Sequence, residues 1–169
     1  ILTLASFLIV IAFGQGLVIL VGGLDLSIGS VIMLGGVMVT AWSGTGYPQF
    51  LMILAAMALA AGVGLINALG VLWLKVPPFI MTMATGIIVA SAALGYTKGT
   101  PRGVTPDLFT LLMKSSLLGM PVILIFVGLF VVAGAILQGW TSFGRRLQAI
   151  GININAARVA GLSVTRPVV

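Results

Sequence analysis

The sequence predicts an all-α membrane protein, a polytopic transmembrane helical bundle of about five spans followed by a short cytoplasmic helix. Hydrophobic residues make up 60% of its 169 residues and charged residues only 6%, whereas soluble domains carry about 25% charged residues. The apolar residues fall in runs that approach the roughly 20 residues needed to cross a bilayer. The basic residues collect at the ends of these runs, as they do in membrane proteins.

Five apolar stretches are the expected spans, and glycine, proline or charge bounds each of them. Asp25 and the glycines before it end the first, Pro77 and Pro78 end the third, and Pro121 opens the fifth, because proline is tolerated in the first turn of a helix. The expected spans are residues 1–21, 26–42, 50–74, 79–97 and 121–140. An extracytoplasmic loop is expected at 98–120, with a short interfacial helix at 107–118, and a cytoplasmic loop at 141–169.

The basic residues indicate which side of the membrane each connection faces. Alternating the five spans puts five basic residues on one side and three on the other, and Lys and Arg favour the cytoplasm. The predicted cytoplasmic set is Lys75, Arg145, Arg146, Arg158 and Arg166, and the predicted outer set is Lys98, Arg102 and Lys114. Because no aromatic residues are interleaved with these charges, membrane topology explains them better than nucleic-acid binding.

Several classes of chemistry are excluded by missing residue types. The chain contains no Cys, no His and no Glu, which removes disulfides, thiolate nucleophiles and His- or Cys-based metal sites. Its carboxylates are Asp25 and Asp107, which are expected in different compartments. We therefore expect neither an enzyme nor a metal or cofactor site. The start at Ile1 lacks the features of a signal peptide, and the chain is expected to be an internal piece of a longer protein with further spans.

Small residues recur every four positions in two of the spans. Such spacing lets helix backbones approach closely, so it favours helix packing over a substrate-lining face. The residues are Ala56, Ala60, Gly64 and Ala68 in the third span, and Thr82, Gly86 and Ala90 in the fourth.

Three polar residues interrupt the apolar runs. Asp25 precedes an apolar helix, where it can cap the first turn; composition favours this interpretation. The alternative is that Gly22, Gly23 and Gly29 permit a broken helix that brings Asp25 near a transport path. The amides of Gln15 and Asn67 can equally fasten helices together or face a polar cavity.

The segment after the fifth span is more than a charged anchor. Residues 154–162 are expected to form a short amphipathic helix that Gly161 ends. Gly144, Gly151 and Asn153 are spaced through the preceding residues, which indicates a shaped loop.

Three segments together resemble the permease subunits of bacterial ABC importers for ribose and related sugars, including autoinducer-2 systems. Residues 22–30 (GGLDLSIGS) are similar to the family's GGIDLSVGS. Residues 74–82 (LKVPPFIMT) are similar to its LRVPPFIVT stretch, and residues 141–162 to its TxFGRxxxAIGxNxxAARxxGI loop.

The resemblance implies that residues 141–169 are a cytoplasmic coupling loop, with a coupling helix that docks on an ATPase. Asn155, Ala156, Ala157 and Gly161 keep the spacing of the family's EAAxxxG motif, with Asn in place of Glu, and Ile152 stands where the family often has Gly. The expected docking residues are Gly144, Arg145, Gly151, Asn153, Ala156, Ala157, Arg158 and Gly161. The residues expected to line or gate the path are Asp25, Ser27, Asn67, Thr82 and Thr85, with packing as the alternative for the last three.

The function that the resemblance implies is ATP-driven sugar import across the bacterial inner membrane by a multi-pass permease. The implied partners are two cytoplasmic ATP-binding subunits, a second permease subunit and an extracytoplasmic solute-binding protein. ATP would bind the partner, because this chain has no GxxxxGK[ST] loop. The alternatives are an ion- or proton-coupled secondary transporter, for which only Asp25 offers an intramembrane carboxylate, and a structural assembly subunit.

Overall fold

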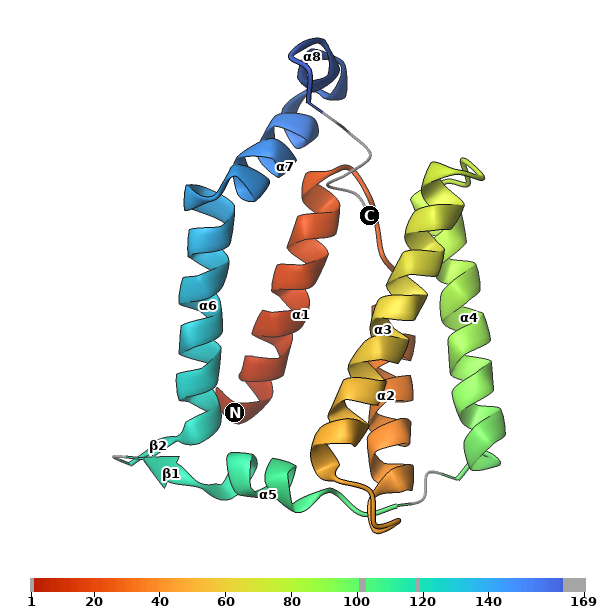
Figure 1. Ribbon diagram of the computed structural model, residues 1–169, viewed down its shortest axis with the longest axis vertical. Helices are drawn as coiled ribbons and strands as arrows, with labels where there is room; N and C mark the ends of the chain where they lie inside the picture. Colours follow the sequence, from red (N-terminus) through yellow and green to blue (C-terminus); the bar gives the residue numbers. More distant parts are fainter. Residues whose placement is uncertain (1, 101–102, 118, 163–169) are drawn as a thin grey trace. The chain divides into compact units, whose positions relative to one another are not determined.

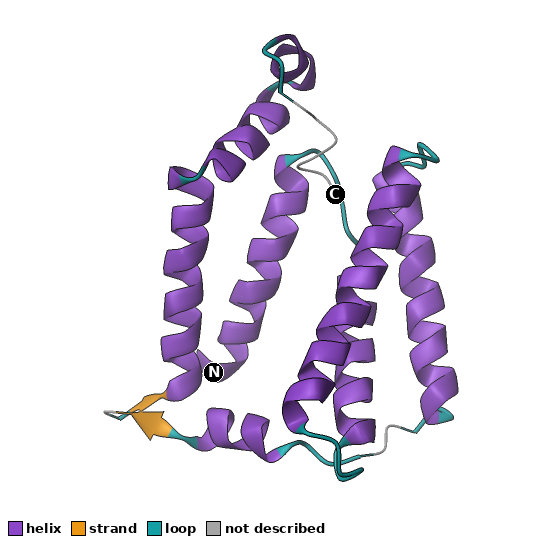
Figure 2. Ribbon diagram, in the orientation of Figure 1, coloured by secondary structure: helices purple, strands orange, loops and turns teal. Residues whose placement is uncertain are grey.

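The computed structural model describes residues 2–100, 103–117 and 119–162, and this part of the chain is helical apart from one short hairpin (Figures 1 and 2). The elements are α1 (Leu2–Leu20), α2 (Ile28–Trp42), α3 (Gln49–Leu72), α4 (Pro78–Thr97), α5 (Asp107–Lys114), β1 (Ser116–Leu117), β2 (Met120–Pro121), α6 (Val122–Trp140), α7 (Ser142–Ile152) and α8 (Ile154–Val159).

The predicted all-α class is confirmed. In the described part of the chain, α3, α4 and α6 are long and apolar enough to cross a membrane, while α2 and the portion Ala5–Leu20 of α1 are shorter apolar segments. The helices form two compact units. Unit 1 contains α1, the hairpin and α6 to α8, and unit 2 contains α2, α3, α4 and the first half of α5.

In unit 2, α2, α3 and α4 pack against one another (Figure 1). Thr82 and Gly86 of α4 are buried, so the packing interpretation of the small residues is confirmed there. Gly64 is exposed, with no atom within 4 Å of the position of an added Cβ, so it makes no close contact within the described residues. The buried face of α3 instead carries Met52, Val63, Asn67 and Gly70.

In unit 1, α1 and α6 run side by side (Figure 1). The ring of Phe13 meets that of Phe130 edge to face, with centroids 5.2 Å apart, a favourable arrangement for an aromatic pair. Gly134 makes room for this ring, because an added Cβ would lie 2.6 Å from Phe13 Cε2.

The connections differ from the sequence predictions in two places. The helix expected at 107–118 ends at Lys114, and a hairpin follows in which Gly119 has a φ of +80°. The loop expected before residue 154 is mostly the helix α7. Arg102 and Arg166, which were used to predict the topology, lie outside the described residues.

Candidate functional site

The chain before α2 is not helical, and Asp25 organises it. Asp25 Oδ1 accepts the backbone N–H of Ser27 at 2.8 Å and the Ser27 hydroxyl at 2.6 Å. This is the local turn that Asp side chains form with the backbone two residues on. The N-cap position of α2 is Ser27, which makes no side-chain cap bond. Asp25 therefore holds the turn before the helix and does not occupy the N-cap position.

Residues 25–27, here called the helix break, lie beside interior turns of α4. The N–H of Leu26 donates to Thr82 Oγ1 at 3.1 Å, and an added Cβ on Gly86 would lie 3.3 Å from Ser27 Cα. At 1.5 Å per residue, Thr82 and Gly86 are about 6 and 12 Å from the start of α4 at Pro78. Irregular backbone at such a depth requires protein or a cavity around it.

A chain of hydrogen bonds links the helix break to α3. Asn67 Nδ2 donates to Ser27 Oγ at 3.0 Å, and only 1% of Ser27 and 6% of Asn67 is exposed. Ser27 has one hydroxyl proton and gives it to Asp25, so its oxygen can only accept from Asn67. This fixes the orientation of the amide.

The fixed amide leaves one acceptor unused. Asn67 Oδ1 is buried and has no hydrogen-bond partner among the described residues. An unsatisfied buried acceptor costs about 1 to 3 kcal/mol and requires an explanation. Gln15 Oε1, in unit 1, is buried and unpartnered in the same way.

Thr85 is the expected path residue that the hydrogen bonds do not include. It is buried on α4, and its hydroxyl donates to the Met81 carbonyl of its own helix at 2.9 Å. Of the expected path residues, Asp25 and Ser27 belong to the helix break, and Asn67 and Thr82 bind it through hydrogen bonds. Thr85 lies on α4 as a packing residue.

Residues 141–162, here called the terminal hook, are two capped helices. Thr141 Oγ1 accepts the N–H of Gly144 at 3.2 Å at the start of α7. Asn153 Oδ1 accepts the N–H groups of Asn155 and Ala156, both at 3.0 Å, at the start of α8. Each side chain satisfies donors that the first turn of a helix leaves free.

Two glycines of the terminal hook are packing residues. A methyl group at Gly144 would overlap the carbonyl of Gln138, and one at Gly151 would overlap the carbonyl of Leu20. These glycines therefore let α7 lie directly against the ends of α6 and α1. Ala157, another expected docking residue, is 4% exposed.

Gly161 ends α8 through its backbone conformation. Its φ is +76°, its N–H donates to the Arg158 carbonyl at 3.1 Å, and that of Leu162 donates to the Ala157 carbonyl at 3.0 Å. These bonds form a Schellman motif. An added Cβ would meet no atom within 4 Å, so the requirement is for positive φ rather than for space.

The hook exposes two apolar side chains, here called its exposed apolar face, which sequence reasoning missed. Ile152 is 86% exposed and Val159 is 90% exposed, although neither was predicted as a docking residue. Arg145, Asn153, Ala156 and Arg158 are also exposed. The one sequence signal for an exposed apolar residue was Ile152, which stands where the family often has glycine.

Comparison with known proteins identifies the chain's family. A family model described as the permease component of branched-chain amino acid transport systems matches residues 1–169. The chain belongs to this family. The resemblance seen in the three sequence segments is thereby confirmed.

The curated relatives are permeases for sugars and related solutes. The chain is 38% identical over 158 residues to the ribose import permease protein RbsC of Bacillus subtilis. The aligned residues cover 92% of this chain and 49% of that protein. It is 33% identical over 166 residues to the galactofuranose transporter permease protein YtfT of Escherichia coli, covering 96% and 48%. The autoinducer 2 import system permease protein LsrC of Yersinia enterocolitica is 30% identical over 163 residues, covering 94% and 44%.

The chain spans about half the length of the curated relatives it matches. No solved structure matches it.

Proposed function

We propose that this chain is part of the permease of an ATP-driven importer for ribose or a related sugar in the bacterial inner membrane. The names of the curated relatives support a sugar or sugar-like solute. The complete permease would pair with a second permease subunit and receive its solute from an extracytoplasmic binding protein. Two cytoplasmic subunits would bind and hydrolyse ATP, and this chain would hold no cofactor.

The observation that carries this proposal is the exposed apolar face of the terminal hook. Ile152 and Val159 project from short helices that are capped and packed at their base. Short helices with apolar anchors suit a groove on a partner protein. Arg145 and Arg158 flank this face and can pair with carboxylates of the ATPase.

The base of the hook provides a route for coupling. Gly151 contacts the end of α1 and Gly144 contacts the end of α6, so neither helix can stay in place if α7 is displaced. ATP-driven movement of the docked subunit would in this way reach α1 and α6. The predicted docking residues Gly144, Gly151 and Ala157 thereby act through packing, and the exposed residues make the contact.

The helix break is proposed to gate or line the solute path. Asp25, Ser27 and Thr82 stabilise a short stretch of irregular backbone deep beside α4. Asn67 Oδ1 is the acceptor left for a solute hydroxyl or a water molecule. Broken helices with unsatisfied polar groups are where transporters of other kinds hold their solutes.

Docking is tested by adding charge to the exposed face. In the complete permease expressed with its ATPase, Ile152→Asp and Val159→Asp should each reduce ATPase co-purification at least about tenfold, since a buried charge without a partner costs several kcal/mol. The matched control is Leu117→Asp in β1, which is 57% exposed on the predicted outer side and should have no effect. Normal co-purification of both hook variants would refute the docking surface.

A further inference from the structure

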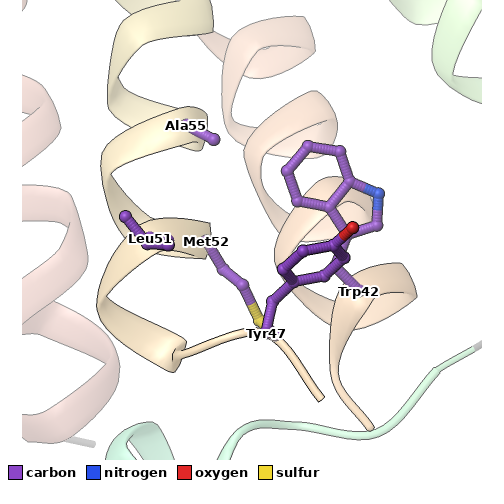
Figure 3. Close-up of a pocket in the computed structure, with 5 residues that line it drawn as sticks. All are labelled: Trp42, Tyr47, Leu51, Met52 and Ala55. Atoms are coloured by element: carbon purple, nitrogen blue, oxygen red, sulfur yellow. The ribbon is translucent and has the colours of Figure 1, made fainter. Parts of the chain in front are cut away.

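Two neighbouring cavities lie in unit 2 where α2 meets α3, and Figure 3 shows the first of them. The first has a volume of about 450 Å³ and an aromatic and apolar lining of Trp42, Tyr47, Leu51, Met52 and Ala55. The second, of about 410 Å³, shares Tyr47 and Met52 with the first. Its polar lining residues are Ser43, Gln49, Thr105 and Asp107.

Contacts between distant parts of unit 2 shape the polar cavity. Gly103 has a φ of +132°, and a methyl group there would overlap the carbonyl of Thr40, so residue 103 lies directly on the last turns of α2. Gln49 Oε1 accepts the N–H of Leu108 at 3.1 Å, which ties the start of α5 to the start of α3. The segment that carries Thr105 and Asp107 is thus fixed at both ends.

The two cavities offer complementary chemistry. Figure 3 shows the rings of Trp42 and Tyr47 beside the space between α2 and α3, with the Met52 side chain directed toward Tyr47. In the adjoining cavity the Gln49 NH₂ group can donate, because its Oε1 is the atom already used. The Asp107 carboxylate can accept from several donors, and it makes no hydrogen bond or ion pair within the described residues.

We propose that these cavities form an entry site for a monosaccharide. A sugar ring has an apolar C–H face that suits an aromatic wall and hydroxyl groups that both donate and accept. Trp42 and Tyr47 would contact the ring, and Asp107 and Gln49 would bind neighbouring hydroxyls. The volume of each cavity lies in the range of ligand sites, about 300 to 1,000 Å³.

The site lies at the end of unit 2 that the topology prediction places outside the cell. The solute would therefore meet it before reaching the helix break. This inference rests on the proposed function for its ligand class, because the structure itself contains no sugar.

Tyrosine and tryptophan also anchor helices at membrane surfaces, and Tyr96 is a matched control for that role. It is 55% exposed at the same end of unit 2, one residue before α4 ends, and it lines neither cavity. In vesicles containing the complete transporter, Tyr47→Ala and Asp107→Asn should raise the KM for uptake about tenfold, the effect of losing one good contact, while Tyr96→Ala should not. Equal effects of Tyr47→Ala and Tyr96→Ala would indicate anchoring and overturn the site.

Binding is tested without transport by cysteine protection. Ser43 lines the polar cavity, whereas Thr45, in the same loop, is exposed and lines neither cavity. Ser43→Cys and Thr45→Cys would each be introduced into the complete, otherwise cysteine-free permease and labelled with a maleimide. The probes are D-ribose and D-galactose, with mannitol at equal concentration as the osmotic control.

At ten times its midpoint concentration, the bound sugar should slow labelling of Ser43→Cys about tenfold, because only about one site in ten remains empty. Labelling of Thr45→Cys should not change. If wild-type vesicles take up one of these sugars with ATP but the sugar protects neither cysteine, the entry site is wrong and the proposed function stands. If the wild type takes up and binds no sugar, the proposed function fails with it.

Discussion

The helix break and the terminal hook are both held in place by sequence-distant contacts, but through opposite physical means. Side-chain hydrogen bonds hold the helix break, from Asn67 to Ser27 and from Leu26 to Thr82. Close backbone contacts hold the hook, and they are possible because Gly144 and Gly151 have no side chain. The difference indicates that the break can change partners by exchanging hydrogen bonds, whereas the hook moves only as a body with α1 and α6.

This comparison also separates packing residues from residues available for binding. In the hook, Gly144, Gly151 and Ala157 make packing contacts, whereas the exposed side chains include the apolar Ile152 and Val159 as well as Arg145 and Arg158. Around the break, Asn67 Oδ1 is the buried side-chain atom without a hydrogen bond among the described residues. The following substitutions test this difference, from the largest expected change in stability to the smallest.

Gly151→Ala should destabilise unit 1 the most. The added methyl group overlaps the Leu20 carbonyl, which the backbone of α1 holds in place, so we expect a loss of about 3 kcal/mol from overpacking. Denaturant unfolding of the purified permease measures this. Gly128→Ala in α6 is the control, because an added Cβ there meets no atom within 4 Å; it should be neutral or stabilising by about 0.5 to 1 kcal/mol. Equal stabilities of the two variants would mean that α7 does not pack closely on α1.

Ser27→Ala should destabilise the helix break by about 2 kcal/mol. It removes the hydroxyl that donates to Asp25 and leaves Asn67 Nδ2 buried without an acceptor. The same unfolding measurement applies. Thr97→Ala serves as the control because its hydroxyl donates only to carbonyls of its own helix. A loss no greater than that of Thr97→Ala would show that the hydrogen bonds do not hold the break.

Gly161→Ala should cost about 1 kcal/mol, because an L-residue is forced into the left-handed region. The loss is local, so amide hydrogen exchange at Gly161 and Leu162 should accelerate about fivefold. Gly161→Asn should recover part of the protection, since asparagine tolerates this conformation. If alanine exchanges as slowly as glycine, the end of α8 does not depend on the positive φ.

Asn67→Leu should change stability least, by less than about 1 kcal/mol. The lost bond to Ser27 is offset by removal of the unsatisfied Oδ1 and by added apolar contact. Sugar uptake should nevertheless fall several-fold if Oδ1 binds solute hydroxyls. Uptake equal to that of the wild type would remove Asn67 from the proposed path.

The long apolar runs made the helices predictable, since only helices satisfy their own backbone within a membrane. The sequence around Asp25 allowed two interpretations, a cap on the first turn of α2 or a broken helix. The local sequence alone did not distinguish them. The deciding partners, Asn67 and Thr82, are 40 and 56 residues from the residues they bind, and no local pattern indicates such pairing.

In the hook, the second helix was predicted and the first was not. Residues 154–162 were expected to form a short helix that Gly161 ends, which α8 confirms, whereas a loop was expected where α7 lies. Gly144 and Gly151 disfavour helix by local propensity, yet the capping side chain of Thr141 and the burial of Leu147 and Ile150 stabilise α7. The glycines are tolerated because each meets another segment's backbone, a tertiary contact that composition does not reveal. The exposure of Ile152 and Val159 follows from the same packing.

ATP dependence of uptake tests the central claim most directly. Vesicles would contain the complete permease with its ATPase, with the binding protein and radiolabelled D-ribose on the outer side. Uptake should require ATP on the cytoplasmic side, persist when ionophores collapse the ion and proton gradients, and be lost in Ile152→Asp. Uptake that continues without ATP and stops when the gradients collapse would contradict the account and identify a secondary transporter.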